Sequence, residues 1–211
     1  MRIYGAGGHS QVIRKVLELQ GYEVTETFDD KPDFVHMAYD QSYVEDGARA
    51  NLKSFPHAGP PVIVAIGNNK DRAEIASFLK TNYGKVIHPS AIIAKNTEID
   101  LGTVVFAGAI IQPNTTIGKH VIINTGASVD HDIILGDFVL ISPKVALCGH
   151  VEVGQGTHIG VGAVVIPKIK IGRWCTIGAG SVIIRDVPDF TTVVGNPGKI
   201  IKTERIELKL S

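Results

Sequence analysis

The 211-residue sequence has little cysteine, no long hydrophobic run and no excess of charge of one sign. Its two cysteines, Cys148 and Cys175, are too few and too far apart for a disulfide framework or a zinc knuckle. The longest apolar stretches, residues 62–66 and 107–111, fall far short of the roughly 20 residues that span a bilayer, so we expect no membrane span. No signal-peptide pattern opens the chain, which predicts a cytoplasmic protein.

The charges of the chain balance. Lys plus Arg and Asp plus Glu number 21 each, and the isoelectric point is about 7.1. A chain without a basic excess has no general electrostatic attraction to nucleic acid or to an acidic membrane. We therefore expect small-molecule partners and no nucleic acid.

A six-residue period dominates the sequence. Between Ile87 and Ile183 every sixth residue is isoleucine, leucine or valine, over seventeen positions in succession. Four residues after many of these positions stands a second small or branched residue, such as Ala109 or Thr157. This period is typical of a hexapeptide-repeat β-helix, in which each unit forms one short strand and one corner and three units close one coil of a triangular prism. The sequence predicts between five and six coils, with residues 18 apart lying one above another.

The repeat also assigns places to glycine and cysteine. Cys175 falls on the second inward position and is expected in the core, whereas Cys148 faces outward. Several glycines directly follow an aliphatic position, where we expect the missing Cβ atom to ease a tight corner. They are Gly118, Gly136, Gly154, Gly160, Gly172 and Gly178.

Strand and helix signals alternate before the repeat, which predicts a small parallel sheet like half of a doubly wound fold. We expect a Rossmann-like domain over residues 1–85, the β-helix over residues 86–187 and a C-terminal cap over residues 188–211. A glycine-rich loop, residues 5–10, lies between the first strand and the first helix. It is either a phosphate cradle or a tight turn. Asp29 and Asp30 end the second strand, where they either accept hydrogen bonds from a base or ribose or are solvated.

His131 is the histidine whose surroundings best suit proton transfer. It lies at a predicted corner between Asp130 and Asp132, which could orient the ring and stabilise its charged form. Gly149 stands 18 residues further on and is predicted to lie beside His131 in the next coil. A backbone N–H with no side chain over it is a candidate oxyanion donor. A base and an oxyanion donor would then face one gap.

The other histidines of the repeat offer less. His120 and His158 are expected at corners as surface residues. A catalytic metal usually takes three protein ligands. Only His131 and His150 come near the stacking distance of 18 residues, so we expect no metal.

The whole chain resembles the left-handed β-helix acyltransferases that modify nucleotide-activated sugars. It is most similar to the bacterial UDP-4-amino-sugar N-acetyltransferases of the PglD type, with the sialic acid O-acetyltransferases of the NeuD type close behind. The resemblance is carried by residues 5–10 (GAGGHS), 28–30 (FDD), 65–69 (AIGNN), 87–91 (IHPSA), 124–125 (NT), 131–132 (HD) and 195–197 (GNP).

The resemblance implies an acetyl-CoA-dependent enzyme that acetylates the 4-amino group of a nucleotide-linked amino-dideoxy sugar, with UDP as the nucleotide, for bacterial glycan biosynthesis. It implies a homotrimer in which acetyl-CoA lies along the left-handed β-helix between subunits. His131 would be the general base, and Asp132 stands where relatives often have glutamate.

The remaining site residues also follow from the resemblance. Asn124 would help to position the acceptor, and the N–H of Gly149 would hold the acetyl carbonyl. The CoA arm would contact the backbones of Val161 and Ala179. The nucleotide side would be lined by Gly5, Gly8, His9, Asp29, Asp30 and Asn68.

Two other functions stay open at this point. The chain could O-acetylate a hydroxyl of sialic acid or another sugar, or it could be a non-catalytic scaffold that binds sugar nucleotides. No acyl-enzyme is needed in the expected mechanism, because neither cysteine is placed as an obligatory nucleophile.

Overall fold

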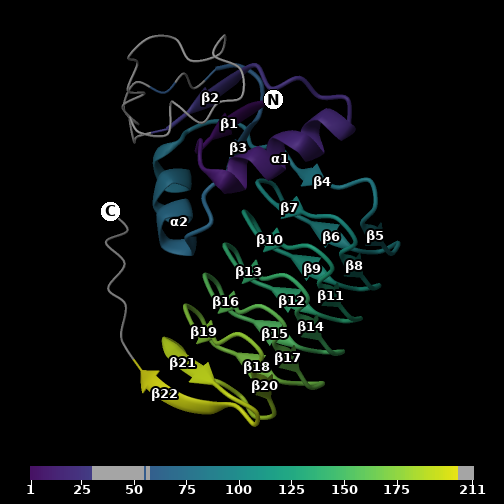
Figure 1. Cartoon of the computed structure of the whole chain (residues 1–211), viewed down its shortest axis with the longest axis vertical. Coiled ribbons are helices and arrows are strands. Elements are labelled where there is room, and N and C mark those ends of the chain that lie inside the picture. The colour runs from purple at the N-terminus through teal and green to yellow at the C-terminus, as the bar shows by residue number, and fades with distance from the viewer. Residues whose placement is uncertain (30–54, 56–57, 204–211) are drawn as a thin grey trace.

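The computed structural model describes residues 1–29, 55 and 58–203 of the chain. A small α/β domain lies at one end of a long β-helix, and a C-terminal hairpin lies at the other end (Figure 1). The α/β domain contains a three-stranded parallel sheet in the order β2-β1-β3, as predicted. Its elements are β1 (Arg2–Tyr4), α1 (Gly8–Leu19), β2 (Glu26–Phe28), β3 (Val62–Val64) and α2 (Asn69–Phe78).

Seventeen two-residue strands, β4 to β20, form the three faces of the β-helix, and each pairs in parallel with the strand 18 residues away. Face 1 contains β4 (Val86–Ile87), β7 (Val104–Val105), β10 (Ile122–Ile123), β13 (Leu140–Ile141), β16 (His158–Ile159) and β19 (Thr176–Ile177). Face 2 contains β5 (Ile92–Ile93), β8 (Ile110–Ile111), β11 (Ser128–Val129), β14 (Ala146–Leu147), β17 (Val164–Val165) and β20 (Val182–Ile183). Face 3 contains β6 (Glu98–Ile99), β9 (Thr116–Ile117), β12 (Ile134–Leu135), β15 (Glu152–Val153) and β18 (Lys170–Ile171).

The predicted six-residue period matches the strands of this structure residue by residue. Each predicted aliphatic position is the second residue of a strand, and its side chain fills the prism. The second inward register is also buried, with Ala109, Thr157 and Cys175 all at 1 % exposure or less. We name the corners by the faces that they join: edge 1–2 includes residues 124–127, 160–163 and 178–181, edge 2–3 includes residues 130–133 and 148–151, and edge 3–1 includes residues 118–121, 136–139 and 154–157.

Contrary to expectation, the tight corners do not depend on the glycines that directly follow the strands. In every corner from Asn96 to Gly180 the left-handed backbone falls on the second residue of the turn, again at intervals of six. The glycines that follow the strands are not in this conformation. They are required because coils approach closely: a Cβ atom on Gly154 would lie 2.5 Å from the backbone nitrogen of Arg173 in the next coil.

The α/β domain packs against face 1 of the prism. The outward side chains at the first position of β4, β7 and β10 share one apolar cluster with α1, and the cluster includes Ile13, Leu17, Val86, Val104 and Ile122. Helix α2 lies along the same side (Figure 1). Asn69 on α2 donates from its side chain to the carbonyl of Gly156 on edge 3–1 at 3.0 Å.

A buried arginine fixes this docking. Arg72 on α2 is fully buried, and burial lowers its pKa to about 9. The guanidinium donates only to uncharged oxygens on both sides of the junction, which satisfies its polarity without a carboxylate. These acceptors are the carbonyls of Ile66, Gly67, His120 and Phe138 and the side-chain oxygen of Asn69.

His120 is buried, although the sequence predicted a surface position. Its ring stacks on Phe138 with 5.1 Å between centroids and meets the edge of Tyr83 at 4.4 Å, so that only 4 % of the residue is exposed. Burial lowers its pKa to about 4. The sequence position identified the corner correctly, but it gave no sign that the α/β domain covers this edge. His158 was expected at a corner on the surface, but it is half-buried at the first position of strand β16, where its Nε2 lies 2.9 Å from Ser142 Oγ.

The C-terminal segment continues the prism, and Val193 adds an apolar side chain to its core. Strand β21 (Thr191–Val194) continues face 1 beside β19, and β22 (Lys199–Thr203) pairs with β21 in antiparallel fashion. Within the segment expected to form the cap, Ile200 and Ile201 are more than half exposed. Among the described residues, neither helix has the length and apolar character needed to cross a membrane.

Replacing Arg72 should loosen the junction between the two domains. We expect Arg72→Met to lower the free energy of unfolding by at least about 3 kcal/mol, because an apolar chain of similar length leaves buried carbonyls without donors. Thermal and urea unfolding would measure the change. The control is Arg173→Met, since Arg173 is exposed and pairs with Asp189 at the surface, a contact worth about 0–1 kcal/mol. Equal effects of the two substitutions would contradict this role of Arg72.

Candidate active site

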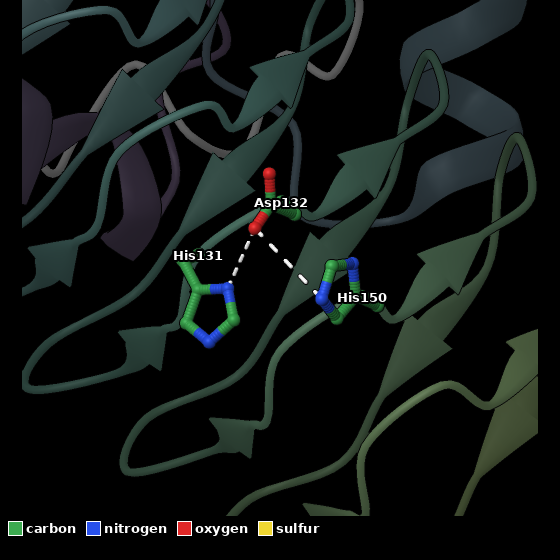
Figure 2. Close-up of side chains that lie close together, drawn as sticks. All are labelled: His131, Asp132 and His150. Carbon is green, nitrogen blue, oxygen red and sulfur yellow. Dashed lines mark hydrogen bonds and ion pairs between the residues drawn. The ribbon is translucent and has the colours of Figure 1, made fainter.

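His131, Asp132 and Gly149 meet on edge 2–3 of the prism, as the sequence predicted. His131 Nδ1 lies 2.7 Å from Asp132 Oδ2 (Figure 2). A Cβ atom on Gly149 would lie 2.6 Å from Cε1 and 2.7 Å from Nε2 of His131, so the glycine lies directly beside the ring. Only glycine leaves room for the imidazole at this point of the next coil.

The charge on Asp132 sets the state of the His131 ring. The hydrogen bond to Asp132 raises the pKa of His131, and the same bond lowers the pKa of Asp132. Because an ionised carboxylate only accepts hydrogen bonds, neutral His131 carries its proton on Nδ1 and its lone pair on Nε2. The ring is half exposed. His131 is therefore poised to take a proton at Nε2, beside Gly149.

The backbone N–H of Gly149 is available to a ligand. In the preceding coil, the equivalent N–H of His131 donates to the Asp130 carboxylate at 2.8 Å. At Gly149 the preceding residue is Cys148, which offers no oxygen, and the described part of the chain contains no acceptor for this N–H. A free backbone N–H thus lies beside the imidazole of His131, and its role as an oxyanion donor stays a prediction.

Two further residues complete this corner, and sequence reasoning gave them no role. Asn114 and His150 lie 18 residues before and after Asp132, so the three side chains form a column on edge 2–3. Asn114 Nδ2 donates to Asp132 Oδ1 at 3.2 Å, and His150 Nε2 lies 3.9 Å from Asp132 Oδ2. The 18-residue spacing that placed Gly149 beside His131 also places both residues in the column of Asp132.

The glycine-rich loop lies at the carboxyl ends of the parallel strands, where doubly wound sheets bind ligands. Gly5 has φ +111°, and a Cβ atom there would lie 2.8 Å from the carbonyl oxygen of Ala65. Asp29 Oδ2 accepts from the backbone N–H of Ala6 at 2.7 Å, so this carboxylate holds the loop. Gly8 is the first residue of α1, whose N-terminus has no side-chain cap.

Two other residues predicted to contact the nucleotide already have partners within the protein. Asn68 caps α2 by accepting from the backbone N–H groups of Lys70 and Asp71. The ring of His9 meets Phe106 edge-on, and burial lowers its pKa to about 4, so this histidine is neutral. Asp30 lies outside the described residues.

The remaining predicted contacts lie on a different edge from the base. Asn124, Val161 and Ala179 all lie on edge 1–2, and Val161 is half exposed. Face 2 separates this edge from His131. One chain therefore does not bring all the predicted site residues together.

Two protein families match the sequence. The PglD N-terminal domain matches residues 1–79, and the bacterial transferase hexapeptide family (six repeats) matches residues 150–185. A comparison with the curated proteins gave no match.

Solved structures show likeness over nearly the whole chain. A histidine-to-asparagine mutant of perosamine N-acetyltransferase from Caulobacter crescentus, in complex with CoA and GDP-perosamine, is 34% identical with a TM-score of 0.85, over 95% of this chain and 96% of that one. The acetyltransferase domain of PglB from Neisseria gonorrhoeae, in complex with acetyl coenzyme A, is 34% identical with a TM-score of 0.83, over 95% and 98%. These likenesses confirm the predicted α/β domain followed by a left-handed β-helix.

The pair formed by His131 and Asp132 can be tested directly. We expect nuclear magnetic resonance titration to give His131 a pKa above the ordinary 6.5, because the carboxylate stabilises the imidazolium. Asp132→Asn should lower that pKa, since the amide carries no charge. His88→Asn, which changes a histidine on another edge, should leave it unchanged. A His131 pKa that is insensitive to Asp132→Asn would show that the hydrogen bond is not formed in solution.

Proposed function

Because the chain belongs to the left-handed β-helix sugar acetyltransferases that carry a PglD N-terminal domain, we propose that it transfers an acetyl group from acetyl-CoA to an amino group of a nucleotide-linked sugar. The single observation that carries this proposal is the placement of the Nε2 atom of His131 against Gly149, with Asp132 on the opposite ring nitrogen. The relatives support both cosubstrates, since their structures hold CoA, acetyl coenzyme A or GDP-perosamine.

The geometry supports direct transfer. The sugar amine attacks the thioester carbonyl of acetyl-CoA, and His131 Nε2 accepts the proton that the amine loses. Asp132 holds the ring through Nδ1 and stabilises the imidazolium that forms. The N–H of Gly149 donates to the carbonyl oxygen as negative charge develops there. The tetrahedral intermediate then collapses with cleavage of the C–S bond, and the proton held by His131 passes to the departing sulfur. CoA therefore leaves as the thiol, and no acyl-enzyme forms.

The site needs two subunits. The α/β domain docks on face 1, whereas His131 lies on edge 2–3, the edge opposite that face in a triangular prism. A nucleotide sugar held at the glycine-rich loop is therefore on the wrong side of its own chain to reach its own His131. We therefore propose that the base comes from a neighbouring copy.

Face 2 is suited to bring the copies together. Its outward side chains are small or apolar, whereas face 3 presents charged residues such as Glu152 and Lys170. If three copies turn face 2 to a common axis, edge 1–2 of one copy meets edge 2–3 of the next. Val161 and Ala179 of one subunit then face His131 of another, which accounts for a trimer with sites between subunits. The outward residues of face 2 are Ile92, Ile110, Ser128, Ala146, Val164 and Val182.

The finer substrate assignment is a proposal in two parts. We place the acceptor at the 4-amino group of an amino-dideoxy sugar for bacterial glycan biosynthesis, as the resemblance to the PglD type implies. The resemblance to the PglD type implied UDP as the nucleotide. The perosamine enzyme is bound to GDP-perosamine, so likeness to known structures supports no choice of UDP over GDP. The family assignment argues against a non-catalytic scaffold. Sialic acid O-acetylation and the cytoplasmic location stay untested.

A substrate panel tests this function. We expect the enzyme to consume acetyl-CoA with one 4-amino sugar linked to UDP, GDP or dTDP, and to leave sialic acid unchanged. His131→Ala should lower kcat by about 10²- to 10⁴-fold, because the amine loses its proton acceptor, while the affinity for CoA measured by calorimetry stays within about twofold. His88→Asn is the matched histidine control. Turnover of sialic acid alone would show that the chain is an O-acetyltransferase. An active His131→Ala variant would show that His131 is not the general base.

Subunit mixing tests the composite site. His131→Ala disables edge 2–3, and Val161→Trp places a bulky side chain on exposed edge 1–2. Each variant alone should be inactive. Trimers co-assembled from equal amounts should regain about a quarter of wild-type activity, because about one interface in four joins two intact edges. No recovery in co-assembled trimers would show that each chain carries its own complete site.

A further inference from the structure

A compact set of metal-ligating atoms lies on edge 2–3. His131 Nδ1, Asp132 Oδ2 and His150 Nε2 all lie within 4.8 Å of one another. Figure 2 shows the two imidazoles on either side of one carboxylate oxygen. Their ring planes are at 90° to each other. Two imidazoles and one carboxylate are a donor set that suits zinc and neighbouring transition metals better than magnesium or calcium.

The distances lie close to those of a tetrahedral ion and need a small adjustment. Zinc bonds to histidine nitrogen and carboxylate oxygen at about 2.0–2.2 Å, which places adjacent ligand atoms about 3.3–3.5 Å apart. The observed separations from Asp132 Oδ2 are 2.7 Å to His131 Nδ1 and 3.9 Å to His150 Nε2, one below and one above this value. Small rotations of three partly exposed side chains would equalise them, and solvent would supply the fourth ligand.

The β-helix holds these ligands in place. Asp132 and His150 occupy the same left-handed turn position in successive coils, with φ 56° and 61°. The coils are joined at this corner by the hydrogen bond from His150 N to the carbonyl of His131 at 3.1 Å. Asn114 Nδ2 donates to Asp132 Oδ1, which leaves Oδ2 directed at both histidines. Such outer hydrogen bonds orient metal ligands.

We propose that His131, Asp132 and His150 bind a divalent transition-metal ion, with zinc as the best fit, and that this ion reversibly inhibits acetyl transfer. Neutral imidazole has one lone pair. When the ion takes Nδ1 of His131, the ring proton must lie on Nε2, which can then no longer accept a proton from the acceptor amine. The ion is an inhibitor and not a cofactor, because it occupies the base that the reaction needs.

The inhibitory effect rests on the proposed role of His131, whereas the binding site does not. Binding is therefore measured first and without substrates. Full-length protein is stripped with a chelator and titrated with Co²⁺, whose visible absorption reports tetrahedral coordination, and with Zn²⁺ by calorimetry. We expect one ion per chain and an intense tetrahedral Co²⁺ spectrum.

Three variants locate the ion. His150→Asn should weaken Zn²⁺ binding at least tenfold and remove the Co²⁺ spectrum, because it removes one ligand and keeps the size of the side chain similar. His88→Asn changes a histidine on another edge and should bind as the wild type does. Cys148→Ser should also bind normally, which excludes this partly exposed thiol as the ligand. Unchanged binding in His150→Asn, or equal loss in His88→Asn, would overturn the site.

Turnover links binding to inhibition. Acetylated sugar is followed by chromatography rather than by a thiol reagent, since free CoA thiol and thiol reagents both interact with zinc. Wild-type activity should fall with a midpoint that equals the measured Kd and recover with chelator. Relative to its own turnover without metal, His150→Asn should need at least tenfold more Zn²⁺ for half-inhibition. Stoichiometric binding without loss of turnover would overturn the inhibitory role, whereas His150-dependent binding in a protein that acetylates no sugar would refute the proposed function and leave the metal site standing.

Discussion

The fixed register between successive coils is the constraint on which the rest of this structure depends. Parallel pairing joins Ser128 to Ala146 and Val129 to Leu147, so the residues that follow these strands are matched as well. This register puts Gly149 beside His131 and His150 beside Asp132. A one-residue slip would replace the free N–H at the base by a side chain and would turn the inward aliphatic residues outward. The precision of the site thus comes from backbone hydrogen bonds, which cost no side-chain flexibility.

The docking of the α/β domain on face 1 decides which edges of the prism stay exposed. Arg72 and Asn69 attach α2 to carbonyls on edge 3–1, and the apolar cluster with α1 covers the first strands. A buried guanidinium with only uncharged acceptors is tolerated because each of its donors is satisfied. This attachment leaves edge 2–3 uncovered by its own domain. The same junction that stabilises the chain therefore places the glycine-rich loop and His131 on opposite sides of the prism, which is why the proposed reaction depends on a neighbouring copy.

The sequence predicted the features that follow from period. Every inward aliphatic residue, the buried Cys175 and the contact between His131 and Gly149 could be found by counting in steps of six and eighteen. Contacts between the two domains could not, because no period relates α2 to the prism. This is why His120 was expected at the surface and why Arg72 had no predicted role. Asn114 and His150 are an intermediate case. The 18-residue period places both in one column with Asp132, but the period alone does not show that their side chains turn toward its carboxylate.

The left-handed corners show why backbone strain does not identify the functional edge. A non-glycine residue in this conformation costs about 1–2 kcal/mol, and Asp132 and His150 both adopt it. Phe138 and Trp174 adopt it as well, in corners where they serve packing. The left-handed conformation is therefore a property of the corners of the repeat and does not mark a catalytic residue. Aspartate is one of the residues that tolerate this backbone best, and from this position its short side chain still reaches His131 Nδ1 at 2.7 Å. What distinguishes edge 2–3 is the side chains that an ordinary corner holds there: a carboxylate, two imidazoles and a glycine whose N–H has been left free.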